Sequence, residues 1–178
     1  MRLKKILIKD LQKLLCTDGE LSFKDLIKYY FKYPCYKYVV NFRLCNYLSK
    51  KKSLIIFFCL FRLNFRRLSI KLGIQMPYTT KIGEGFSIHH YSCIVIHGDS
   101  IIGKNLNIRQ GVTIGEVNSK VPIIGNDVYI GAGAKVIGKV VIGNNVIIGA
   151  NSVVTKDVPD NSVVAGVPAK IIRNIKLQ

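Results

Sequence analysis

Aliphatic residues recur at every sixth position through the second half of the chain, and this spacing constrains the fold more than any other feature. One run extends from Ile96 to Ile114 and a second from Ile124 to Val154. An α-helix repeats every 3.6 residues and a strand every two, so neither produces this period. A chain that turns a corner every six residues does, because three such hexads close one triangular coil. Stacked coils then pair strand on strand, and the aliphatic side chains form a continuous core. The pattern predicts a parallel β-helix.

Residues 1–74 carry a different pattern, that of a small helical region. Over residues 3–15, leucines recur at helical spacing with lysines between them, which predicts an amphipathic helix. Ser22 and Asp25 predict a cap at the start of a second helix. Two further helices are expected over the apolar, aromatic-rich stretches 36–48 and 54–72. The expected fold class is therefore mostly β, with a helical region preceding the β-helix.

The charge of the chain supports the same division into 1–74, a basic helical region, and 75–178, a β-helix domain with a short C-terminal tail. The sequence holds 27 Lys and Arg against 10 Asp and Glu, and residues 1–74 hold 17 of the basic and four of the acidic residues. A basic segment suits anionic membranes or polymers, or can simply be solvated. No nucleic-acid-binding module accompanies it, so no nucleic-acid partner is expected. Peripheral contact with an anionic membrane is left open.

Two further features bear on the location of the protein. The longest apolar run, Ser53 to Phe61, is about half the length that a membrane-spanning helix needs. The five cysteines form no Cys-x-x-Cys pair, which favours reduced thiols in a cytoplasmic protein and argues against a metal site. The expected location is cytoplasmic, with the inner face of the membrane as a peripheral alternative.

The six-residue period breaks twice, and such breaks are where a solenoid extrudes residues that carry function. Ile88 and Ile96 lie eight residues apart, so the segment His-His-Tyr-Ser-Cys between them contains two surplus residues. Ile114 and Ile124 lie ten apart, which predicts a short loop over residues 116–120. Because one coil takes about eighteen residues, both breaks fall at neighbouring levels. They are expected to flank one groove.

His90, in the first break, is the candidate general base. A histidine with an ordinary pKa near 6.5 can accept the proton of an attacking hydroxyl at neutral pH. His89, His97 and Gln110 are the candidates for binding the acceptor. The base is expected to work with one of three carboxylates or with none, and Glu116 is favoured because it begins the loop; the three are Glu84, Asp99 and Glu116.

Residues 76–173 resemble the serine acetyltransferase branch of the hexapeptide-repeat acyltransferases. The resemblance rests on SIHHYSCIVIHGDSIIGKNLNIRQGVTIG, IIGNDVYIGAGAKVIGKVVIGNNVIIGANSVVTKDVP and AGVPAKIIR. It implies a left-handed β-helix, acetyl-CoA as co-substrate without a metal, and His90 as the base. It also implies a homotrimer with each active site between two β-helices, with a dimer of trimers left open. The positions that it assigns to CoA binding are Ala132, Ala150, Thr155, Lys156, Lys170 and Arg173.

Three departures from this branch bear on the acceptor. Gln75 stands where the family has an aspartate that assists the base, His89 replaces an acidic residue, and the loop EVNSKVP lacks an Arg-His pair that binds the carboxylate of serine. The sequence therefore predicts an O-acetyltransferase for a sugar hydroxyl of a capsular or exopolysaccharide, or of its precursor. Two alternatives stay open: a serine O-acetyltransferase of cysteine biosynthesis, and a non-enzymatic β-helix scaffold with a basic arm that binds nucleic acid or membrane.

Overall fold

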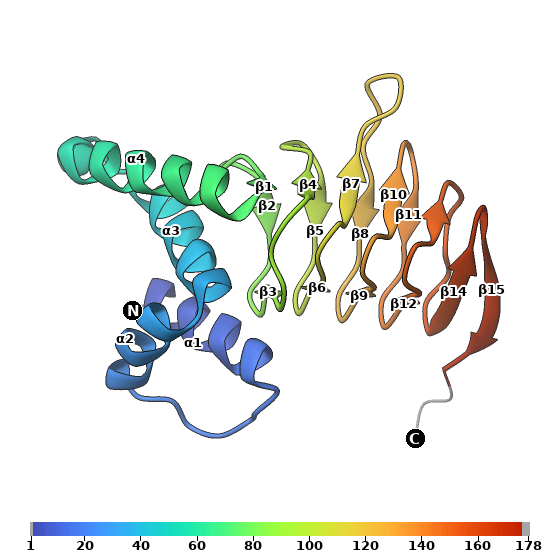
Figure 1. The fold of residues 1–178 in the computed structure, drawn as a ribbon, viewed down its shortest axis with the longest axis horizontal. Coiled ribbons are helices and arrows are strands. Elements are labelled where there is room, and N and C mark those ends of the chain that lie inside the picture. Colours follow the sequence, from blue (N-terminus) through green and yellow to red (C-terminus); the bar gives the residue numbers. More distant parts are fainter. Residues whose placement is uncertain (1, 176–178) are drawn as a thin grey trace.

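The structure is a computed structural model and describes residues 2–175. A helical region precedes a β-helix, and the two lie end to end (Figure 1). The expected fold class is confirmed. The helical elements are α1 (Arg2–Leu15), α2 (Phe23–Lys32), α3 (Pro34–Leu48), the short 3₁₀ helix η1 (Lys52–Leu54) and α4 (Ile55–Leu72).

The ends of the helices follow from local sequence. Ser22 and Asp25 form the expected capping box before α2: the Asp25 amide donates to Ser22 Oγ at 3.3 Å, and the Ser22 amide donates to Asp25 Oδ2 at 2.9 Å. Pro34 occupies the first turn of α3, where its missing N–H costs nothing. The helix α4 ends at Gly73, whose φ of 61° is a conformation that glycine adopts without strain.

The β-helix consists of three sheets, which the chain visits in turn and which are parallel except for the last strand pair. The first sheet contains β1 (Ile74–Gln75), β4 (Ile94–Ile96), β7 (Thr113–Gly115), β10 (Lys135–Ile137) and β13 (Val153–Val154). The second contains β2 (Lys81–Ile82), β5 (Ile101–Ile102), β8 (Ile123–Ile124) and β11 (Val141–Ile142). The third contains β3 (Ser87–Ile88), β6 (Asn107–Ile108), β9 (Tyr129–Ile130), β12 (Ile147–Ile148), β14 (Ser162–Gly166) and β15 (Ala169–Asn174).

The aliphatic residues of the hexads form the core of the β-helix. Ile88, Ile108 and Ile130 lie one above another in the third sheet and are at most 1% exposed. Glycines and asparagines occupy several of the corners. Asn105 and Asn145, for example, have φ of 59° and 53°, a left-handed conformation that asparagine tolerates.

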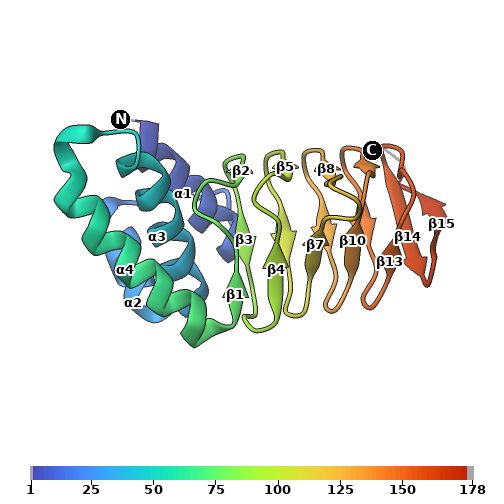
Figure 2. The same ribbon diagram turned by 90° about the horizontal axis from the view of Figure 1, so that it is seen from above.

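A buried ion pair joins the helical region to the first coil. Asp10 of α1 is fully buried and accepts two hydrogen bonds from the Arg43 guanidinium of α3, at 2.9 and 3.1 Å. Asp10 also accepts the backbone N–H of Phe86 at 2.8 Å, while Arg43 donates to the carbonyl oxygen of Ile82 at 2.7 Å. Figure 2 shows the helices covering the end of the β-helix that this contact joins. The helical region is thereby fixed against the coil that carries the first break.

The far end of the β-helix closes differently. The last two strands, β14 and β15, pair antiparallel, whereas every other strand pair is parallel within the part of the chain described. Across residues 2–175, no helix combines the length and apolarity that crossing a membrane requires.

Candidate active site

The first break forms a bulge at the corner between the third and first sheets. Before it, Ile88 pairs with Ile108, 20 residues on, and after it Val95 pairs with Thr113, 18 residues on. The difference of two residues confirms the predicted surplus, and the pairing on either side places it between His89 and Ser92. The corner, called the His90 corner below, comprises residues 89–93, 109–112, 131–134 and 149–152.

The backbone of this corner is held in an unusual conformation. Ser92 and Cys93 have φ of 96° and 54°, values that cost energy for residues other than glycine. In the next coils the equivalent places are taken mainly by glycine, including Gly111 with φ of 72°. The Gly111 amide donates to the Ser92 carbonyl oxygen at 2.9 Å and so holds the bulge to the coil beside it. Hydrogen bonds to the next coil thus hold the chain before the bulge, at His89, and at its end, at Ser92.

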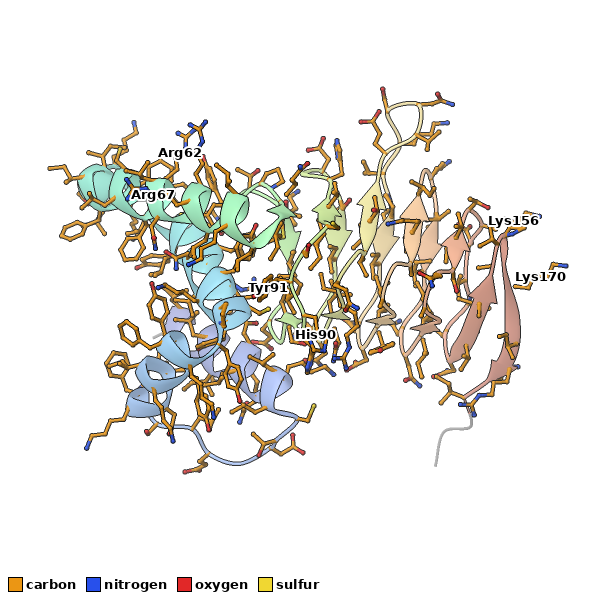
Figure 3. All side chains as sticks on the ribbon, viewed as in Figure 1. Arg62, Arg67, His90, Tyr91, Lys156 and Lys170 are labelled. Atoms are coloured by element: carbon orange, nitrogen blue, oxygen red, sulfur yellow. The ribbon has the colours of Figure 1, made fainter. Side chains whose placement is uncertain are left out.

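His90 is exposed and lines a hollow of about 310 Å³ between the β-helix and the helical region. Figure 3 shows His90 and Tyr91 at this junction. The remaining lining residues come from both parts of the chain: Leu14, Tyr33, Pro34, Cys35, Ile88, His89 and Tyr91. That helices would form a wall of the site could not be predicted from the sequence, because it depends on how the helical region docks.

Two groups near His90 are neutral at neutral pH. Burial raises the pKa of the Cys35 thiol to about 11, so this side chain is a poor nucleophile there. Burial, followed by the charges of Arg109, His90 and Lys13, lowers the pKa of His89 below its ordinary value. Asn107 Nδ2 donates to His89 Nε2 at 3.2 Å, which fits an unprotonated ring nitrogen. The Cys35 thiol therefore does not act as a base at neutral pH, and the contact with Asn107 occupies the Nε2 atom of His89.

The second break is a miniature hairpin at the corner between the first and second sheets. The amide of Val117 donates to the Lys120 carbonyl oxygen at 3.0 Å, and the amide of Lys120 donates to that of Val117 at 3.1 Å. The two residues between them, Asn118 and Ser119, have φ of 53° and 58°, as a type I′ turn requires. This corner, the loop corner, comprises residues 97–100, 116–122, 138–140 and 155–157.

Glu116 contacts His97 within the chain and not His90. Its Oε2 lies 3.3 Å from His97 Nε2, and its Oε1 accepts the Ser119 amide at 2.8 Å. The Asp99 amide donates to His97 Nδ1 at 3.3 Å. The third candidate carboxylate, of Glu84, pairs with Lys104 at 3.2 Å.

The two breaks therefore lie on different corners of the same chain, on either side of the first sheet. This differs from the single groove expected from their neighbouring levels, because the sequence period fixes the level of a residue but not the corner that it occupies. A carboxylate partner for His90 remains a prediction.

The residues assigned to CoA divide between these corners. Ala132 and Ala150 continue the His90 corner along successive coils, in line with Gln110, the candidate for binding the acceptor, because the Gly133 amide donates to the Gln110 carbonyl oxygen and the Asn151 amide to that of Ala132. Thr155 and Lys156 lie at the loop corner, and Lys170 and Arg173 lie on β15. Figure 3 shows Lys156 and Lys170 at the end of the β-helix remote from His90.

These basic residues have a charge suited to the phosphates of CoA. Lys156, Lys170 and Arg173 are exposed, and none forms an ion pair with another residue in the stretch 2–175. The same stretch contains no group of three or more His, Cys, Asp or Glu side chains that could hold a metal ion.

Comparisons with known proteins place these features in a family context. Residues 122–156 match the model "Bacterial transferase hexapeptide (six repeats)". The chain is 35% identical to a serine acetyltransferase of Helicobacter pylori over 79% of its own length and 82% of that protein. It is 34% identical to the serine acetyltransferase of Haemophilus influenzae over 78% of its own length, but spans only about half, 52%, of that relative.

Solved structures agree over nearly the whole chain. A crystal structure of Neisseria gonorrhoeae serine acetyltransferase covers 99% of this chain and 69% of its own, with a TM-score of 0.81 and 28% identity. A serine acetyltransferase in complex with CoA covers 96% of this chain and 69% of its own, with a TM-score of 0.77 and 30% identity. The helical region is included in this likeness, because residues 1–74 are far more numerous than the few per cent of the chain that these structures leave uncovered.

Proposed function

Because the chain belongs to the serine acetyltransferase family of hexapeptide-repeat acyltransferases, we propose that it transfers the acetyl group of acetyl-CoA to the hydroxyl of L-serine. The observation that carries the proposal is the position of His90, exposed at a bulge and facing a hollow. The relatives named above are serine acetyltransferases, so they support serine over the glycan acceptor expected from the sequence.

The proposed reaction uses His90 as a general base. Its imidazole accepts the proton of the acceptor hydroxyl while the hydroxyl oxygen attacks the thioester carbonyl carbon. The C–S bond breaks, and the departing CoA thiolate takes the proton from the imidazolium. The acetyl group ends as an ester on the acceptor, and CoA leaves as a free thiol.

Acetyl-CoA fits the side chains that would hold it. Ala132 and Ala150 are small residues on the coils that follow His90 at the same corner, so a pantetheine arm can approach the backbone there. The exposed cations Lys156, Lys170 and Arg173 can meet the phosphates at the far end. These assignments are proposals, in which the protein orients acetyl-CoA and supplies positive charge for its phosphates.

A glycan hydroxyl is the second candidate acceptor, and Gln75 is the observation that favours it. Gln75 is exposed on β1 and lines a hollow of about 590 Å³ together with Ser92 and Cys93 of the His90 corner. An amide there cannot assist the base as a carboxylate would. The loop corner likewise presents Lys120 and no Arg-His pair.

A direct assay separates the two acceptors. Purified protein is incubated with acetyl-CoA and either L-serine or a panel of sugars and oligosaccharides, and release of the CoA thiol is followed. We expect saturable turnover with L-serine and only the background rate of hydrolysis with the saccharides. Turnover with a saccharide alone would overturn the serine assignment while leaving the acetyltransferase intact. Absence of transfer to every acceptor would contradict the proposed function.

The division of the site between two corners supports assembly into a trimer. His90 of one chain and the loop corner of another can form one site only if β-helices pack side by side, as the resemblance implies. Light scattering should therefore give a mass of three, or of six, times 20.0 kDa. A monomer that is fully active would contradict this assembly.

The helical region supports peripheral contact with anionic lipid. The outer face of α4 exposes Ile56, Leu63 and Ile70, with Arg66 and Arg67 between them. Apolar and basic side chains on one helix face suit a membrane interface. We expect sedimentation with vesicles that contain phosphatidylserine at low salt, and none with neutral vesicles. Equal binding to both, or to neither, would remove this proposal.

A further inference from the structure

Polar and cationic side chains gather on the outer side of the His90 corner, where the described mechanism uses none of them. His89 and Arg109 occupy the same place in successive coils, since the His89 amide donates to the Ile108 carbonyl oxygen at 3.2 Å. Asn107 lies beside them and contacts His89. Lys13 of α1 and Asn107 line a second hollow, of about 430 Å³. Leu14, the next residue of α1, lines the hollow that contains His90.

Arg109 is held in place but left without an anionic partner. Its guanidinium carbon lies 5.6 Å from the centroid of the Tyr129 ring, a contact that orients the guanidinium plane. Within residues 2–175, the ion pairs involve neither Arg109 nor Lys13. The buried Arg109 Nε and Asn107 Oδ1 also lack hydrogen-bond partners there. A buried polar atom without a partner is costly, so this arrangement calls for a ligand.

The charge around the cluster selects the kind of ligand. Lys13, Arg109 and His90 together disfavour a further positive charge on His89, and this lowers the pKa of His89 in addition to the effect of burial. Two carboxylates also line the second hollow. Asp127 accepts a hydrogen bond from Asn105 Nδ2 at 2.8 Å, and Asp18 lies in the exposed segment after α1. Neither carboxylate forms an ion pair with Lys13 or Arg109 within residues 2–175, so these two cations keep a positive charge that an anion would neutralise.

We propose that Lys13, His89 and Arg109 form a subsite, the Arg109 subsite, that binds an anionic group of the acceptor while its hydroxyl faces His90. The group is a carboxylate or a phosphate, and the carboxylate of L-serine is of this kind. Arg109 supplies paired N–H donors in a plane that matches an oxyanion, and Lys13 supplies a point charge. His89 is a positioning residue that holds Asn107. Because the subsite is assigned to the acceptor of acetyl transfer, the inference rests on the proposed function.

Paired acceptors test the subsite by turnover. L-serine is compared with L-serinamide, and galacturonate with galactose, so that each anion has a neutral counterpart whichever acceptor class is used. For the wild type, the anionic member should have the lower KM. In Arg109→Gln we expect the KM for the anionic acceptor to rise about 10- to 100-fold, as for loss of a hydrogen bond to a charged group. The kcat, the KM for acetyl-CoA and the KM for the neutral acceptor should change little.

Arg109→Lys is the matched variant, because it keeps the charge and loses the paired donors. It should recover part of the affinity for the anion, whereas a merely structural defect would affect anionic and neutral acceptors alike. An unchanged KM for the anionic acceptor in Arg109→Gln would overturn the subsite. So would a wild type that takes the neutral acceptor equally well.

A second measurement needs no turnover and therefore distinguishes failure of the subsite from failure of the proposed function. Sodium sulfate is titrated into the protein while the imidazole signals of His89 are followed by NMR. A bound anion stabilises the imidazolium form, so the pKa of His89 should rise in a saturable way. Sodium chloride at equal ionic strength controls for screening. The rise should be absent in Arg109→Gln, and a wild type that shows no saturable change would refute the subsite even if acetyl transfer were established.

Discussion

Replacement of His90 by alanine should lower the rate of acetyl transfer by about 10²- to 10⁴-fold, the usual contribution of a positioned general base. The reason is that the acceptor hydroxyl keeps its proton until it attacks, and His90 is the exposed imidazole at the bulge. Cys35 is protonated at neutral pH, and His89 is engaged with Asn107. The loss should appear in kcat, measured by thiol release at saturating acetyl-CoA.

His90→Asn is the matched control, since it keeps a polar side chain at the bulge but cannot accept a proton at neutral pH. Both variants should bind CoA as the wild type does, because the residues assigned to the cofactor lie on later coils. Both should also unfold at the same urea concentration, because His90 is exposed. Retention of more than a tenth of the wild-type kcat in either variant would remove His90 from the role of base.

The second large effect is expected at the junction between the two parts of the chain. Asp10→Asn should lower the free energy of unfolding by about 3–5 kcal/mol, the typical result of breaking a buried ion pair on one side. The Arg43 guanidinium would keep its charge in a buried place without the carboxylate that compensates it. Urea denaturation followed by circular dichroism measures this loss.

The exposed Asp25→Asn is the control for the same chemical change. It weakens a helix cap and should cost about 1 kcal/mol or less. Hydrogen exchange adds a local measurement, because the Phe86 amide donates directly to Asp10 and should exchange faster in Asp10→Asn. If the two variants lose equal stability, the ion pair does not lock the helical region to the first coil.

The sequence predicted the fold well because its signals are local. The six-residue period fixes the aliphatic core, and Ile108 and Ile130 are buried as that period requires. The capping box at Ser22 and the end of the last helix near Gly73 depend only on neighbouring residues, and both are confirmed. The two surplus residues beside His89 can likewise be counted from the sequence of a single coil.

The site was only partly predictable, because much of it depends on contacts between distant segments. Asp10 and Phe86 lie 76 residues apart, and their contact is decided by the docking of α1 on the first coil. The same docking brings Lys13 to the His90 corner. Arg109 was the signal for the subsite in the sequence. It occupies a corner position that the next coils fill with Gly131 and Gly149, and a large cation at such a position indicates an anionic partner.

The hairpin that ends the β-helix has a consequence for how copies of the chain can associate. Each coil of a parallel solenoid offers the next an open row of N–H and C=O groups, so an uncapped end can template the addition of further chains and grow into a filament. Here β15 runs against β14, which interrupts the parallel repeat, and it carries Lys170 and Arg173 on exposed positions. The helices cover the opposite end through Asp10 and Arg43. Open-ended growth by strand addition is thereby disfavoured at both ends of the third sheet.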